Sequence, residues 1–358
     1  MKIVFILPGR GGSGGVRCAS IVAQGLLDHG HDVRVLCRKP AGGLRNRARG
    51  LHHRMFYADA PDWLSEFSGA VEYFDDITTC RFPEGELIVA FGMASSGLLA
   101  LLDHVSNPKA QYLHGTTPWD PVLMKQALSL RVPRIAVASY LREIVASFGG
   151  GEVSAVVHNG VDCRQYYSSV PESERDGVGL IYSCHIAKDP ETALSVVRKL
   201  REARPEVPVR VFSSDRRPRQ LNQVPYCRYA TVQQARDIYS RSLVWIVPSR
   251  AEGFSMPVLE AMACGCAVVA TDCGGTRDII SEGENGFLAP VGDVDAIIRR
   301  VQLALDDEIL RTKIRHNAKA TAARFTWERC IENLEAALMR VTHQAGARQE
   351  EPVVADNS

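Results

Sequence analysis

The chain has 358 residues, with a hydrophobic fraction of 46% and a charged fraction of 23%. Its formal net charge of +1 argues against a nucleic-acid partner, and no apolar stretch reaches the length of about 18 residues that a membrane-spanning helix requires. The length exceeds what one hydrophobic core usually spans and therefore predicts two domains.

Short apolar runs alternate with helical patterns along the first part of the chain. The expected strands lie at 2–7, 31–37, 86–91, 111–113, 134–138 and 154–158. The expected helices between them lie at 16–29, 95–105 and 140–148. This alternation is typical of a parallel, doubly wound α/β sheet. The first apolar run is too short for a signal peptide, so we expect a cytoplasmic protein.

The same alternation restarts after residue 165. Expected strands lie at 179–183, 208–212, 243–247, 267–271 and 286–290, and expected helices at 190–203, 232–241, 257–264 and 275–282. Two Rossmann-like doubly wound parallel-sheet domains that face each other across a cleft follow from this restart. We assign them to residues 1–165 and 166–326. Amphipathic helices near 293–306, 307–324 and 327–342 come next, and we expect residues 343–358 to be disordered.

A glycine-rich loop follows the first expected strand. Gly9-Arg-Gly11-Gly-Ser-Gly14 has the spacing of the dinucleotide-binding fingerprint and opens the first expected helix. A dehydrogenase would also need an acid at the end of the second strand, where Leu36-Cys-Arg-Lys39 offers cations instead. Arg38 would suit a 2′-phosphate, so an NADP enzyme remains an alternative. The second half of the chain argues against it, because its two glutamates and their loop have no task in hydride transfer.

Those glutamates, Glu252 and Glu260, flank a predicted helix start with seven residues between them. The loop that carries Glu252 leads from a strand to Pro257, and proline is favoured in the first helical turn. The unpaired N–H groups at a helix start suit phosphate oxygens, and carboxylates accept hydrogen bonds from vicinal hydroxyls. The pattern therefore predicts a ligand with a diphosphate between two hydroxyl-bearing groups.

The two glutamates and their loop resemble the donor-binding signature of retaining GT-B glycosyltransferases of family GT4, the glycosyl transferases group 1. The likeness extends to Thr271-Asp-Cys-Gly-Gly275, to Asn285-Gly-Phe-Leu288 and to His158-Asn-Gly-Val-Asp162. The resemblance implies the GT-B fold and transfer of a sugar from a nucleotide-diphosphate-sugar donor to a hydroxyl acceptor, which would be a glycan, a lipid-linked sugar or a small molecule. It implies no cofactor and no metal, and it implies that the helix near 327–342 packs back on the first domain.

The resemblance also implies roles for particular residues. Glu260 would hold the ribose hydroxyls of the donor, and Glu252 the hydroxyls of the donor sugar. Lys188 would neutralise the departing diphosphate. His114 would contact the donor sugar from the first domain. The remaining donor-binding positions would lie in two glycine-containing loops, at Gly14, Gly15, Gly253, Phe254, Ser255, Met256 and Val258.

The chain departs from the family pattern just before Lys188. Many members of the family carry a Gly-Arg pair there, whereas this chain has Cys184-His185. We expect either His185 or the pair Arg216 and Arg217 to supply the missing positive charge.

Two further motifs have an ordinary structural explanation beside a functional one. Asp293-Val-Asp295 spells the metal-binding DxD motif of another glycosyltransferase fold, but its position before a helix predicts an N-cap and a first-turn acid. The basic residues Arg45, Arg47, Arg49, His52, His53 and Arg54 predict a solvated loop, or a weak peripheral contact with a membrane.

Two rival classes share this architecture: another GT-B-fold nucleotide-sugar enzyme, such as an epimerase or a phosphorylase, and a non-catalytic nucleotide-sugar-binding protein. No sequence feature specifies the nucleobase, the sugar, the acceptor or the oligomeric state.

Overall fold

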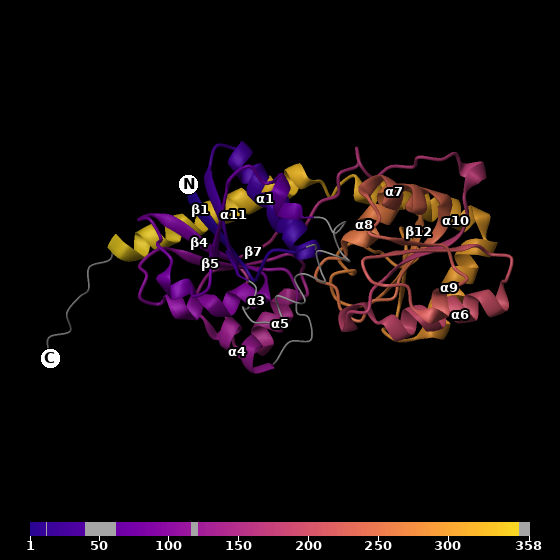
Figure 1. The fold of residues 1–358 in the computed structure, drawn as a ribbon, viewed down its shortest axis with the longest axis horizontal. Coiled ribbons are helices and arrows are strands. Elements are labelled where there is room, and N and C mark those ends of the chain that lie inside the picture. The colour runs from indigo at the N-terminus through magenta and orange to yellow at the C-terminus, as the bar shows by residue number, and fades with distance from the viewer. Residues whose placement is uncertain (12, 40–61, 116–120, 351–358) are drawn as a thin grey trace.

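The computed structural model describes residues 1–11, 13–39, 62–115 and 121–350. Two lobes lie side by side, and each is built on a parallel sheet flanked by helices (Figure 1). The two sheets confirm the predicted fold class of two Rossmann-like α/β domains.

The N-terminal lobe contains a seven-stranded sheet in the order β3-β2-β1-β4-β5-β6-β7. Its strands are β1 (Lys2–Leu7), β2 (Asp32–Arg38), β3 (Ala70–Phe74), β4 (Glu86–Phe91), β5 (Lys109–Leu113), β6 (Arg134–Ala136) and β7 (Ala155–Val156). Its helices are α1 (Gly14–Asp28), α3 (Met93–Ser96), α4 (Pro121–Ser129) and α5 (Leu141–Ser147). The strand order reverses between β1 and β4, and in open α/β sheets such a switch point is where ligands bind.

The C-terminal lobe contains a six-stranded sheet in the order β10-β9-β8-β11-β12-β13. Its strands are β8 (Asp176–Tyr182), β9 (Val209–Ser213), β10 (Tyr226–Arg228), β11 (Ser242–Val247), β12 (Ala267–Thr271) and β13 (Phe287–Ala289). Its helices are α6 (Pro190–Ala203), α7 (Val232–Arg241), α8 (Met256–Ala263), α9 (Val294–Asp306) and α10 (Glu308–Ala322). The switch point here lies between β8 and β11, so the loops that follow these two strands meet at one edge of the sheet.

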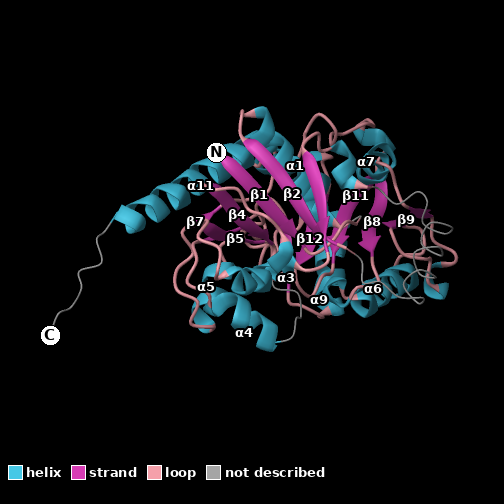
Figure 2. Cartoon of the chain, turned by 60° about the vertical axis from the view of Figure 1, so that its left-hand side comes forward, coloured by secondary structure: helices cyan, strands magenta, loops and turns pink. Residues whose placement is uncertain are grey.

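The last helix, α11 (Trp327–Glu350), leaves the C-terminal lobe and lies along the N-terminal one (Figure 2). It packs against α1, where a Cβ placed on Gly25 would come within 2.2 Å of the Ile331 side chain. Glycine therefore allows these two helices to approach closely. The helix continues to Glu350, whereas the sequence predicted disorder from residue 343; residues 351–358 lie outside the described residues.

Several details of secondary structure differ from the expectation. Residues 275–279 form turns where a helix was expected over 275–282, and residues 97–102 form a 3₁₀ helix within the helix expected at 95–105. The short edge strands β3 and β10 and the helix α4 were not predicted. None of the helices in the described ranges is long and apolar enough to cross a membrane.

Candidate donor-binding site

Glu252 follows β11 at the switch point of the C-terminal sheet and is held by three short hydrogen bonds. The Nζ atom of Lys188, which ends the short 3₁₀ turn Ile186–Lys188 after β8, donates to both carboxylate oxygens, at 2.7 and 2.8 Å. The Ser249 hydroxyl donates to Oε1 at 2.7 Å. Glu252 is only 7% exposed. The structure thus brings together the predicted sugar-binding acid and the predicted phosphate-binding lysine.

Glu260 lies in the second turn of α8, and its carboxylate is shared between the two lobes. Arg17 of α1 donates from Nη1 to Oε1 at 2.7 Å, and the hydroxyl of Tyr239 of α7 donates to Oε2 at 3.0 Å. The Arg17 guanidinium lies 5.1 Å from the ring centroid of Trp63 and 5.7 Å from that of Tyr166. Arg17 was not predicted from the sequence, where its only signal was a basic residue three positions after the Gly14 helix start.

The start of α8 has an unusual backbone. Ser255 precedes the helix with a φ of 41°, a left-handed conformation that a non-glycine residue adopts at a cost of about 1 kcal/mol or more. Its hydroxyl oxygen is buried and has no hydrogen-bond partner among the described residues. Such an outlier, next to an unpartnered polar atom, is typical of a binding loop.

Not every backbone N–H group of this loop is free to bind a phosphate oxygen. The N–H of Val258 donates to the Ser255 carbonyl at 3.0 Å, so it is not one of the unpaired N–H groups expected at the helix start. Pro257 has no N–H. The predicted donors that remain are Phe254, Ser255 and Met256, the last of which begins α8. Phe254 is buried, and its ring stacks on His158 at a centroid distance of 5.1 Å.

At Gly253 the backbones of the two lobes come close together. A Cβ at this position would lie 2.1 Å from the carbonyl oxygen of His114 and 3.4 Å from the Cα of Gly115. No side chain fits there without moving backbone atoms. The loop that carries Glu252 is therefore pressed against the end of β5.

His114 follows β5 and faces this contact from the N-terminal lobe. Its ring stacks on Phe91, with centroids 4.1 Å apart, and lies edge-on to Tyr112 at 4.3 Å. Burial lowers its pKa to about 3, so the imidazole is neutral near pH 7. Its Nε2 atom is buried and lacks a hydrogen-bond partner in the described part of the chain. A buried, unpartnered nitrogen beside Gly253 is a candidate contact for a ligand.

The predicted positions Gly14, Gly15 and His185 make few contacts that point to a ligand. Gly14 opens α1 and has open space around it, and a Cβ on Gly15 would meet only the Ser13 hydroxyl, at 3.9 Å. His185 is exposed and caps the turn before Lys188, because its Nδ1 accepts the Ala187 N–H at 3.2 Å.

The arginines after β9 were the alternative source of positive charge. Arg217 donates to the carbonyls of Asn222 and Tyr226, at 3.3 and 3.4 Å, and lies over the Tyr226 ring. It is thus held by its own loop, and its neighbour Arg216 occupies the same segment. These contacts do not place Arg217 beside Lys188.

Asp293 is an N-cap, as predicted: its carboxylate accepts the Ala296 N–H at 2.8 Å at the start of α9. Asp295 pairs with Lys199 at 2.6 Å. Within the described ranges, no three His, Cys, Asp or Glu side chains gather as a set of metal ligands. The basic run from Arg45 to Arg54 lies outside the described residues.

Comparisons with known proteins find glycosyltransferases among the similar sequences. The model of the family "Glycosyl transferases group 1" matches residues 185–321. An uncharacterised glycosyltransferase of Methanocaldococcus jannaschii is 37% identical over 86 residues, or 24% of each chain. A D-inositol 3-phosphate glycosyltransferase of Corynebacterium urealyticum is 27% identical over 209 residues, 50% of this chain and 49% of the relative. The matches thus span from a quarter to half of these relatives.

The fold extends further than the sequence similarity. The crystal structure of HepE from Anabaena in complex with UDP superposes with a TM-score of 0.71 at 18% identity, and the match covers 95% of this chain and all of HepE. At that identity the likeness concerns the fold alone, which is the two-domain GT-B architecture.

Proposed function

We propose that this chain transfers a sugar from a nucleotide-diphosphate-sugar donor to a hydroxyl acceptor, because residues 185–321 match the model of the glycosyl transferases group 1 family. In this proposal the reaction retains the configuration at the anomeric carbon and needs no metal. The observation that carries the proposal is the pair of buried carboxylates, Glu252 and Glu260, that flank the start of α8 at the domain junction.

Glu260 binds the ribose in this proposal. An ionised carboxylate offers about four lone-pair positions. Arg17 and Tyr239 each donate one hydrogen bond to it. The remaining positions can accept the two vicinal hydroxyls, while the two protein donors fix the orientation of the carboxylate.

Glu252 and Lys188 act together on the sugar and on the leaving group. The ammonium group lies against the carboxylate, so a diphosphate that reaches Lys188 has its sugar next to Glu252. Negative charge grows on the diphosphate as the glycosidic bond breaks, and a fixed cation stabilises that charge more in the transition state than in the ground state. The unpartnered Ser255 hydroxyl and the N–H groups at the start of α8 add hydrogen-bond donors on the same side.

His114 takes part as a neutral hydrogen-bonding group, because its lowered pKa keeps it uncharged at neutral pH. A neutral imidazole can bind a sugar hydroxyl without adding a positive charge beside an anomeric carbon that itself becomes positive. The proton of the acceptor hydroxyl passes to the departing phosphate in this scheme, which is the front-face route that the family resemblance implies.

A donor screen tests the proposal. UDP-, GDP-, ADP- and TDP-sugars are added to the purified protein, and a donor that binds the folded state raises the melting temperature. The likeness to HepE, which was crystallised with UDP, makes UDP-sugars the first to try. Release of nucleoside diphosphate is then followed with and without hydroxyl acceptors, in the presence of EDTA.

The Glu260→Ala variant is the matched test of the ribose role. It removes charge-assisted hydrogen bonds worth about 1.5–3 kcal/mol each, so we expect donor affinity to fall at least ten-fold by calorimetry. Unchanged donor affinity in this variant would exclude the assigned role. Donor binding without any release of nucleoside diphosphate would instead indicate a non-catalytic binding protein.

A further inference from the structure

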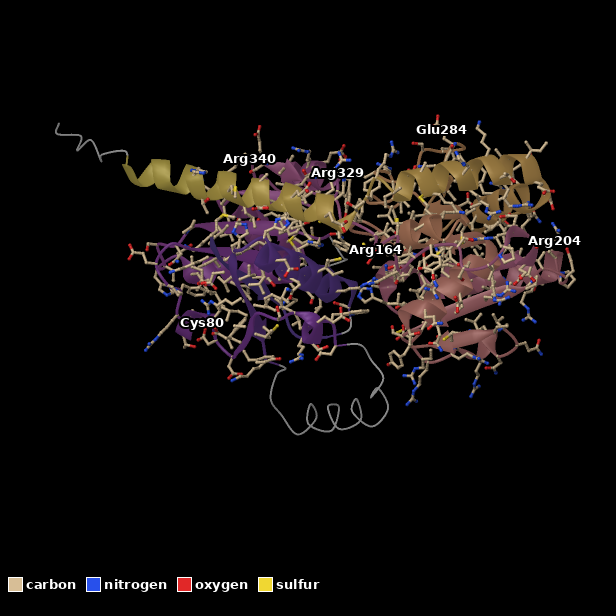
Figure 3. The ribbon with its side chains drawn as sticks, turned by 90° about the horizontal axis from the view of Figure 1, so that it is seen from above. Cys80, Arg164, Arg204, Glu284, Arg329 and Arg340 are labelled. Atoms are coloured by element: carbon tan, nitrogen blue, oxygen red, sulfur yellow. The ribbon has the colours of Figure 1, made fainter. Side chains whose placement is uncertain are left out.

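A cavity lies at the junction of the two lobes, next to the His158 ring on which Phe254 stacks. It has a volume of about 470 Å³, within the range of small-molecule sites. Three segments wall it: residues 156–159 at the end of β7, residues 277–285 after β12, and residues 321–333 around the start of α11. Neither Glu252 nor Glu260 lines it. Figure 3 shows Arg329 beside the meeting of the two lobes.

Three arginine side chains, Arg277, Arg324 and Arg329, line this junction cavity. Asp272 pairs with Arg277. In the described part of the chain, Arg324 has one long contact, from Nη2 to the Thr321 hydroxyl at 3.5 Å, and the Arg329 guanidinium has no ion-pair partner. Two of the three lining arginines thus have no carboxylate partner among the described residues.

The nearby acids already have partners, although Asp278 itself lines the cavity. Asp278 accepts from His158 Nε2 at 2.8 Å and from the Ser139 N–H at 2.7 Å. Glu328, next to Arg329 in sequence, faces Arg164 at 3.7 Å. The cavity therefore keeps a net positive charge, which favours an anionic ligand.

A buried amide adds a second, independent signal. Asn159 lines the cavity and is only 4% exposed, yet its Oδ1 atom is buried with no hydrogen-bond partner among the described residues. A buried polar group without a partner costs about 1–3 kcal/mol, which a ligand can recover. The two ends of an amide are assigned from their hydrogen bonds, so Asn159 can serve either a hydroxyl donor or an anionic acceptor.

We propose that the junction cavity binds a small phosphorylated metabolite, a phosphomonoester on a polyhydroxy body. Its phosphate lies between Arg324 and Arg329, because the planar guanidinium matches phosphate oxygens in bidentate geometry. Its hydroxyl groups reach Asn159. Since the walls come from the end of β7, the C-terminal lobe and the start of α11, the bound molecule connects the parts of the chain that join the two lobes. The site does not depend on the activity proposed above.

The test uses inorganic phosphate and glycerol 3-phosphate as probes, with calorimetry on the full chain. We expect both probes to bind the native protein, glycerol 3-phosphate more tightly. The double variant Arg324→Ala, Arg329→Ala should weaken binding at least ten-fold, as expected for the loss of charge-assisted hydrogen bonds. Arg340→Ala is the matched control, because Arg340 is an exposed arginine further along α11 (Figure 3).

Two further measurements distinguish this site from the donor site and from a lipid surface as the place where phosphate binds. In Lys188→Ala, binding at the junction should persist; loss of the probes in that variant, together with full binding in the double arginine variant, would place the phosphate in the donor site and overturn the proposal. Failure of the native protein to bind either probe would also overturn it. So would arginine-dependent sedimentation with phosphatidylcholine vesicles that contain phosphatidic acid, if no soluble probe binds, because the phosphate would then belong to a lipid surface.

Discussion

The ion pair between Arg17 and Glu260 joins the two lobes, and its removal should have a measurable cost. The side chains are 17% and 8% exposed, so water screens the pair weakly. Breaking a buried pair costs about 3–5 kcal/mol, but the Tyr239 hydroxyl still serves Glu260 in the variant, and we expect about 2–3 kcal/mol for Arg17→Met. Methionine keeps an apolar stem between Trp63 and Tyr166, which limits the loss of packing.

A double-mutant cycle isolates the interaction from these other effects. The free energy of unfolding in urea is measured for the native protein, for Arg17→Met, for Glu260→Gln and for the double variant. We expect a coupling energy of about 2 kcal/mol. The exposed pair Arg10 and Asp62, with side chains 40% and 42% exposed, is the control and should give less than about 1 kcal/mol. Additive effects at Arg17 and Glu260, within about 0.5 kcal/mol, would refute the assignment of an energetically significant bridge.

Three other predictions follow from single contacts. Gly253→Ala places a Cβ 2.1 Å from a backbone oxygen and should lower the free energy of unfolding by about 1–3 kcal/mol, whereas Gly14→Ala, in open space, should change it little in the same urea titration. Folded His114 stays neutral down to about pH 3 while the unfolded chain binds a proton below about pH 6.5, so the free energy of unfolding should fall as pH drops through that window. His114→Asn should flatten this dependence, and an equal slope in both proteins would contradict the burial argument. Lys188→Ala should reduce turnover by roughly 100-fold with a smaller change in donor affinity, whereas His185→Ala should do neither; steady-state kinetics with the donor found in the screen would decide.

Sequence patterns predicted the central strands of both sheets well, since buried parallel strands are continuous apolar runs. The edge strands Ala70–Phe74 and Tyr226–Arg228 were not predicted. The first is mostly exposed and the second has only three residues, so neither forms a continuous apolar run. The helix expected at 275–282 is replaced by turns. The N–H groups of Arg277 and Ile279 donate to carbonyls three residues back, at 3.1 and 3.2 Å, which is the bonding of turns rather than of an α-helix.

Contacts in the candidate site could be predicted where local sequence patterns determine them, but not where they join distant parts of the chain. Lys188 and Glu252 could be predicted to meet, because each follows a strand at the switch point of one sheet. Arg17 could not be predicted as a partner of Glu260, because the two lie 243 residues apart in different lobes and no periodicity connects them. Val258 was assigned from its place in the first turn, where hydrogen bonding to Ser255 was invisible in the sequence.

The return of α11 to the N-terminal lobe has a consequence for biosynthesis. A ribosome releases the strands and helices of this lobe first, yet the helix that covers α1, with Ile331 fitted against Gly25, is made last. Domains usually complete their folding in order of synthesis. Here the second lobe can be finished while the first still exposes the apolar surface that α11 will bury. A nascent chain that ends at about residue 326 should therefore depend more on chaperones than the finished protein.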